Sequence, residues 1–144
     1  MPNQQISRTV ERKLVAQFLY SLEYVNCASV NEVEECFIEY LAKEKKGRVY
    51  NPEDFSWQLI VGVWGKQKKI DETIKAFAQH WKIERIGKIE LIALRIALYE
   101  IMYTPQIPKN VVLKEALDIV KAFGDTQANP FIVGIIEQVA KDSS

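Results

Sequence analysis

The sequence predicts an all-α fold, a single-domain bundle of about seven helices that occupies residues 7–141. Apolar residues recur at helical intervals along almost the whole chain, and no alternating pattern typical of strands persists. The 144 residues are 48% hydrophobic and 26% charged, which is typical of a globular domain with a buried core. Connections are short, and neither a repeat nor a linker divides the chain. Residues 1–6 and 142–144 are expected to be flexible ends.

The first two helices are predicted from their start signals. Ser7 precedes an apolar stripe of helical spacing and can cap the first helix through its hydroxyl oxygen. Ser29 is followed three residues later by Glu32, a capping box that opens the second helix.

A long helical stretch is expected next, because the pair Asn51-Pro52 combines a capping residue with a proline suited to the first helical position. Residues 53–80 then form either one bent helix or two helices in line. Gly62 and Gly65 inside this stretch either weaken the helix or let another helix come close.

The C-terminal half is predicted to hold the central buried helix. Residues 88–103 are apolar on most faces, and Pro105 ends that helix. Pro108 opens the next helix, which Gly124 closes as the residue after its C-terminus. Asn129-Pro130 repeats the cap-plus-proline start for the last helix.

The charge balance bears on the class of partner. The chain has 19 basic and 19 acidic residues, so its formal net charge is zero. Phosphate neutralisation supplies most non-specific affinity for nucleic acid, so this balance argues against a strong stand-alone binder. Acidic residues concentrate in residues 30–54 and basic residues in residues 66–95. This suits a protein that binds RNA with the help of a partner, although solvated helix faces of mixed sign explain it at least equally well.

The residues that usually carry catalysis are scarce. His80 is the only histidine, so neither a histidine-based metal cluster nor a Ser-His-Asp triad can form in one chain. Cys27 and Cys36 lack the spacing of a zinc site and are interpreted as reduced thiols of a cytoplasmic protein. No signal peptide or membrane span is evident. We therefore expect a non-catalytic protein without a cofactor or a metal, and without membrane contact.

The N-terminal segment is the best chemical candidate for RNA contact. Arg8 and Arg12 are four residues apart, so they are neighbours on one helix face near its positive end. Guanidinium groups bind phosphate and stack on splayed bases. A solubilising helix start is the alternative, and spacing alone favours it. Tyr20 lies off the main apolar stripe, where its ring and hydroxyl could stack or hydrogen-bond at a wet interface.

Four blocks of the sequence follow one another at characteristic spacing. Arg8 and Arg12 are followed by Gln17-Phe18-Leu19-Tyr20, Leu94-Arg95-Ile96-Ala97-Leu98-Tyr99-Glu100 lies further along, and residues 108–124 and 131–136 hold the other two. In this order and with this spacing, the blocks resemble the NusB family. The first is similar to its arginine-rich N-terminal motif that ends in Gln-x-Leu-Tyr, the second matches its Leu-Arg-x-Ala-x-Tyr-Glu motif, and the others follow two further family patterns.

The resemblance implies a seven-helix bundle that pairs with the ribosomal protein NusE and binds the boxA element of nascent RNA. It implies a transcription antitermination factor that supports processive transcription of rRNA operons, in an elongation complex with NusA, NusG and RNA polymerase. A homodimer is a further possibility. Glu84 and Glu90 would face the basic partner. The RNA-binding residues implied by the resemblance are Arg8, Arg12, Lys13, Gln17, Tyr20, Phe123, Gln127 and Asn129.

The chain also departs from the family pattern. Thr9, Val10 and Glu11 stand in place of a denser basic run, and Val133 replaces the asparagine of a Phe-Val-Asn-Gly block. Two alternatives therefore stay open. One is a helical protein-interaction module of this fold with weak or lost RNA binding, and the other is the NusB-like RNA-binding domain of an rRNA methyltransferase.

Overall fold

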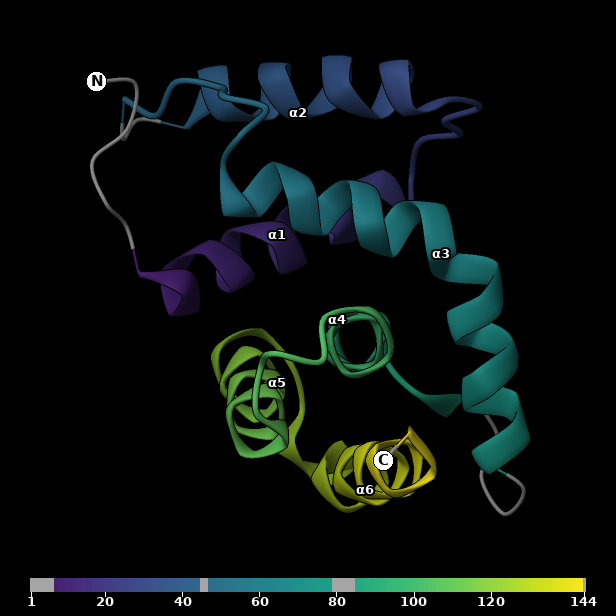
Figure 1. Ribbon diagram of the computed structural model, residues 1–144. Helices are drawn as coiled ribbons and strands as arrows, with labels where there is room; N and C mark the ends of the chain where they lie inside the picture. The colour runs from purple at the N-terminus through teal and green to yellow at the C-terminus, as the bar shows by residue number, and fades with distance from the viewer. Residues whose placement is uncertain (1–6, 45–46, 79–84, 144) are drawn as a thin grey trace. The chain divides into compact units, whose positions relative to one another are not determined.

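All regular secondary structure in the part of the chain that the structure describes is helical (Figure 1). The computed structural model describes residues 7–44, 47–78 and 85–143, and these ranges contain six α-helices, one short 3₁₀ helix and no strand. In chain order the elements are α1 (Arg8–Leu22), α2 (Val30–Lys43), α3 (Phe55–Phe77), α4 (Lys88–Tyr103), α5 (Lys109–Phe123), η2 (Thr126–Ala128) and α6 (Asn129–Ser143). The all-α prediction is confirmed, whereas the predicted number of about seven helices is slightly too high for these ranges. The long stretch forms one helix, α3, because Gly62 and Gly65 lower its helix propensity without breaking it.

The chain divides into two units, residues 1–61 and residues 62–144, and α3 contributes to both. In the first unit, aromatic rings join α1, α2 and the start of α3. The Phe37 ring of α2 lies 4.9 Å from the Phe18 ring of α1 and 5.8 Å from the Trp57 ring of α3, centroid to centroid. All three side chains are buried. Packed rings of this size supply much of the apolar area that a small unit needs.

The first two caps are confirmed and the third is wrong. The Ser7 hydroxyl accepts the N–H of Val10 at 3.3 Å, and the Ser29 hydroxyl accepts the N–H of Glu32 at 3.3 Å. Asn51 instead makes a turn ahead of the helix, since its Oδ1 accepts the N–H of Glu53 at 3.0 Å and α3 begins only at Phe55. An asparagine that bonds two residues ahead forms a local turn rather than a helix cap.

In the second unit, α4 is the central buried helix, as predicted. Residues 91–98 are all buried, and α5 and α6 pack beside α4 (Figure 1). The last helix begins at Asn129, as predicted, but the predicted cap is wrong, because Asn129 has helical dihedral angles and its Oδ1 has no hydrogen-bond partner among the described residues. The preceding turn is capped by Asp125, whose Oδ1 accepts the N–H of Gln127 at 2.9 Å.

Two contacts tie the second half of α3 to α4. Gly62 lets the Tyr99 ring approach, since a Cβ at position 62 would lie 2.6 Å from Cε1 of that ring. Gly65 has no neighbour within 4 Å of an added Cβ, so only the first glycine is explained by a close approach. Arg95 pairs with Asp71 through two bonds, Nε to Oδ1 at 2.9 Å and Nη2 to Oδ2 at 3.0 Å.

Candidate nucleic-acid interface

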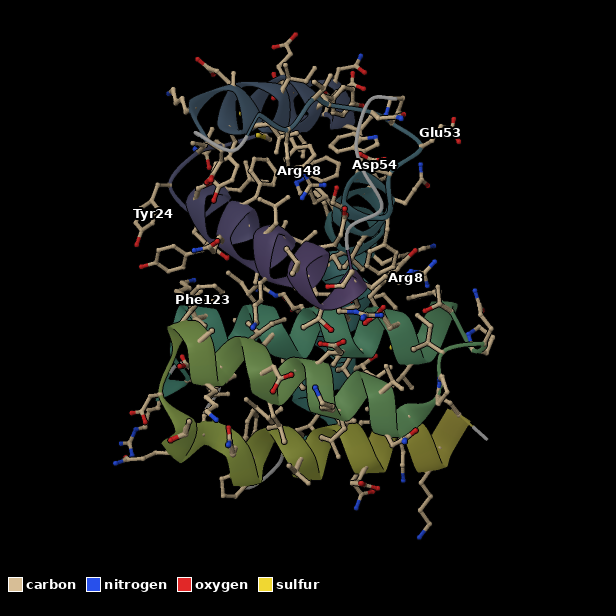
Figure 2. All side chains as sticks on the ribbon, turned by 90° about the vertical axis from the view of Figure 1, so that its left-hand side faces the viewer. Arg8, Tyr24, Arg48, Glu53, Asp54 and Phe123 are labelled. Carbon is tan, nitrogen blue, oxygen red and sulfur yellow. The ribbon has the colours of Figure 1, made fainter. Side chains whose placement is uncertain are left out.

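Arg8, labelled in Figure 2, is the first residue of α1 and is exposed. Its guanidinium lies over the ring of Phe55. The Cζ atom lies 4.5 Å from the ring centroid, which is cation–π distance. A guanidinium stacked on a ring loses rotational freedom but keeps its in-plane N–H groups for an anion. The stacked Arg8 guanidinium is therefore oriented with donors left over for an anion, and its contact with RNA stays a prediction.

Arg12 shares the same ring but not the same exposure. Its Cζ lies 5.0 Å from the Phe55 centroid, and the residue is only 2% exposed. The spacing of four residues correctly placed the two arginines on one helix face, and it carried no information about burial. Direct RNA contact by Arg12 stays a prediction, and in this conformation its guanidinium supports the Phe55 ring.

A buried carboxylate fixes the start of α1 against the start of α3. Glu11 is 6% exposed, its Oε1 lies 2.7 Å from Nη2 of Arg48, and its Oε2 accepts the N–H of Ser56 at 2.7 Å. Ser56 is the second residue of α3, where backbone N–H groups lack helical acceptors and favour negative charge. This tie brings Phe55 under Arg8.

The sequence interpretation missed this tie. Glu11 had been taken only as a departure from a basic run, and nothing drew attention to Phe55 as a support for the arginines. The two partners of Glu11 are 37 and 45 residues away along the chain. No local pattern marks contacts at such separations.

A second face of α1 carries Lys13, Gln17 and Tyr20. Lys13 follows Arg12 directly, so it lies roughly 100° further round the helix. Spacings of four and three residues place the three side chains in one stripe. Gln17 is exposed, Lys13 is half-buried and Tyr20 is 37% exposed. The predicted residues of α1 thus form two faces rather than one.

In the second unit, the remaining predicted RNA contacts gather at the turn after α5. Phe123, the last residue of α5, is 36% exposed, and Gln127 in η2 is exposed (Figure 2 labels Phe123). Asn129 is half-buried, and its Oδ1 is buried without a hydrogen-bond partner among the described residues. This turn therefore offers one aromatic ring and one solvent-facing amide.

Glu90 holds this turn in place. It is 5% exposed, and its carboxylate accepts the N–H of Asp125. Gly87 and Gly124 flank the carboxylate, and a Cβ at position 124 would lie 3.0 Å from Glu90 Cδ and 3.0 Å from Ile89 Cγ2. Gly124 has an extended backbone with φ −125°, so space for Glu90, not left-handed geometry, requires glycine here.

The structure describes only one of the two residues predicted to contact the partner. The Glu90 carboxylate is engaged within its own unit, so a partner contact there would compete with the Asp125 bond and stays a prediction. Glu84 lies outside the described residues.

Other kinds of site find little support in residues 7–44, 47–78 and 85–143. Within these ranges, no group of three or more histidine, cysteine, aspartate or glutamate side chains could hold a metal ion. None of the described helices combines the length and apolar character needed to cross a membrane.

Comparison with known proteins identifies the family. Residues 9–141 match the family model described as NusB family. The transcription antitermination protein NusB of Nitratidesulfovibrio vulgaris (strain DP4) is 44% identical over 135 residues, covering 94% of this chain and 88% of the relative. That of Bacillus subtilis (strain 168) is 33% identical over 137 residues, covering 95% and 97%. A solved structure of T. maritima NusB superposes with a TM-score of 0.75 at 25% identity, covering 96% of this chain and 94% of the other. The chain belongs to the NusB family.

Proposed function

We propose that this protein is a non-catalytic transcription antitermination factor that binds boxA RNA as a heterodimer with the ribosomal protein NusE. It would act in the cytoplasm within an elongation complex that includes NusA, NusG and RNA polymerase, and it would support processive transcription of rRNA operons. Relatives that are 44% and 33% identical carry the name transcription antitermination protein NusB, which supports the general role. The identities of the RNA and of the protein partner are proposed in addition to that general role.

The observation that carries the proposal is the exposed Arg8 guanidinium, held 4.5 Å from the Phe55 centroid. Glu11 fixes Phe55 through the start of α3, so the cation is oriented before any ligand arrives. Pre-orientation lowers the entropy lost when a side chain is immobilised on binding. An arginine used only for solubility has no need of this support.

The need for a partner follows from charge. The chain is neutral overall, and Arg12 is only 2% exposed. Few cations on α1 can therefore neutralise phosphate directly, so strong RNA binding requires positive charge from elsewhere. A basic protein such as NusE would supply it, and charge complementarity would also speed the encounter.

The turn after α5 is proposed to contribute base contacts. Phe123 offers a ring on which an unpaired base can stack, and the Gln127 amide can bond a base edge. Glu90 would act as a positioning residue for this turn through Asp125.

A titration of fluorescently labelled boxA RNA, with and without NusE, tests the proposal by anisotropy. RNA is expected to bind more tightly when NusE is present. Arg8→Ala should weaken binding of the complex about tenfold, as expected for loss of a charge-assisted hydrogen bond, and should reduce the salt slope by about 0.7. Lys68→Ala removes another exposed cation, from α3, and serves as the matched control. Binding by Arg8→Ala equal to that of the control would refute the role of Arg8.

Phe55→Leu separates positioning from charge. It keeps an apolar side chain and both arginines but removes the ring, so affinity should fall about two- to fivefold with the salt slope preserved. The burial of Arg12 also favours one alternative, an interaction module without RNA binding. NusE binding with no gain in RNA affinity would support that alternative and reject the proposal.

A further inference from the structure

Tyr24 is the most conspicuous exposed aromatic residue described in the first unit. It is 74% exposed, and Figure 2 shows its side chain projecting outward from residues 1–61. Burial of apolar surface is favourable, so an aromatic ring left largely in water is available for a ligand.

The Tyr24 ring is held in place by Tyr20. The Tyr24 hydroxyl donates to the Tyr20 hydroxyl at 3.1 Å, and the two rings meet edge to face with centroids 5.7 Å apart. This hydrogen bond raises the pKa of the Tyr24 phenol above its ordinary value. The Tyr20 hydroxyl keeps its own proton for an outside acceptor.

Tyr24 also continues the stripe formed by Lys13, Gln17 and Tyr20. It lies four residues beyond Tyr20, one helical turn further. The helix ends at Leu22, but the following residues keep turning in the same sense, because the N–H of Glu23 bonds the carbonyl of Tyr20 at 3.1 Å. The resulting α1 stripe (Lys13, Gln17, Tyr20 and Tyr24) offers a cation, an amide and two rings in line.

We propose that Tyr24 binds single-stranded RNA by stacking one unpaired base, next to the nucleotides held by Lys13, Gln17 and Tyr20. This inference rests on the proposed RNA-binding function and adds a contact at the C-terminal end of α1.

The composition of the stripe favours RNA over a protein partner. Single-stranded RNA is recognised by cations on its phosphates, polar groups on base edges and aromatic rings on base faces. The α1 stripe supplies each of these in order along one face. Protein interfaces also use tyrosine, but they are depleted in lysine, whereas the α1 stripe combines its two rings with Lys13.

The test uses the full chain with NusE and boxA RNA that carries 2-aminopurine at successive unpaired positions. Stacking on Tyr24 should quench the fluorescence at one position, and Tyr24→Ala should abolish that quenching and weaken RNA binding about tenfold. The salt slope should stay unchanged, because no phosphate contact is lost. Tyr24→Phe keeps the ring and should retain both the quenching and most of the affinity. Val25→Ala, which truncates an adjacent residue that is 49% exposed, is the matched control.

Each contrary result overturns the inference in a recognisable way. Tyr24→Ala binding within about twofold of the unmodified protein, with quenching intact, would refute the Tyr24 contact and leave the proposed function standing. Weaker NusE binding by Tyr24→Ala in the absence of RNA would assign the ring to a protein interface instead. Failure of the unmodified complex to bind the RNA would reject both this inference and the proposed function.

Discussion

Glu11→Ala should lower the free energy of unfolding by about 3–5 kcal/mol, as expected when one partner of a buried ion pair is removed. The carboxylate makes two bonds of 2.7 Å, one to the Arg48 guanidinium and one to the N–H of Ser56. The Arg48 side chain is 11% exposed, and its Nε is already buried without a hydrogen-bond partner among the described residues. Truncation of Glu11 would also remove the acceptor of Arg48 Nη2, in surroundings that water reaches poorly.

Graded variants separate charge from hydrogen bonding. Glu11→Gln keeps an acceptor oxygen for one N–H and removes the charge, so it should cost about 1.5–3 kcal/mol. Arg48→Met removes the other half of the pair. The double variant should be more stable than the sum of the single effects predicts, with a coupling of about 0.5–3 kcal/mol.

Urea unfolding followed by tryptophan fluorescence measures these differences, because Trp57 is 6% exposed and packs in the same unit. Glu35→Ala, which removes an exposed carboxylate from α2, is the control and should lie within about 0.5 kcal/mol of the unmodified protein. A loss below about 1 kcal/mol for Glu11→Ala would refute the reasoning, since such a value is typical of a solvent-exposed pair.

The other expected outcomes concern the second unit and are measured by the same unfolding assay. Gly62→Ala should lower the free energy of unfolding by about 1–3 kcal/mol because the new Cβ overlaps the Tyr99 ring. Gly65→Ala should instead raise it by about 0.5–1 kcal/mol, because an added Cβ has no neighbour within 4 Å and alanine favours the helix. Equal effects of the two variants would disprove the close approach at Gly62. Asp71→Ala should lower the free energy of unfolding by about 1–3 kcal/mol by removing two bonds to Arg95. Arg95→Lys should have a stability between those of the unmodified protein and Asp71→Ala, since it keeps the charge but loses the bidentate geometry. No difference between Asp71→Ala and the unmodified protein would show that the pair contributes nothing.

The helices were predictable where local signals decide them. Ser7 and Ser29 cap as expected because a hydroxyl that bonds a backbone N–H three residues ahead involves only neighbouring residues. The caps predicted at Asn51 and Asn129 were wrong because asparagine occurs in turns as well as at caps, and the surrounding chain selects between them. For the described part of the chain, the predicted helix count was slightly too high because the sequence left open a break at the two glycines in α3.

The candidate site was harder to predict because exposure is a tertiary property. Arg8 and Arg12 have the same chemistry and share a face, yet only Arg8 remains in solvent, and the difference depends on their packing around Phe55. The resemblance implied that Glu90 faces a basic partner, whereas the structure buries it to 5% exposure. Its burial depends on the absence of side chains at Gly87 and Gly124, which only the folded backbone brings together.

The number of exposed cations on α1 limits the salt dependence of RNA binding by the isolated protein. If Arg8 and Lys13 each contact one phosphate, the isolated protein gains a salt slope of only about −1.4, at roughly −0.7 per contact on a single strand. A fourfold rise in salt would then weaken binding only about sevenfold. A steeper slope in the complex with NusE must come from cations that the partner brings or from those that it exposes, of which Arg12 is the nearest candidate. The salt slopes of the Arg12→Ala and Arg8→Ala complexes distinguish cations of NusE from a newly exposed Arg12. If Arg12 becomes exposed, both variants should lose about the same part of the slope. If the partner supplies the extra cations, only Arg8→Ala should reduce the slope.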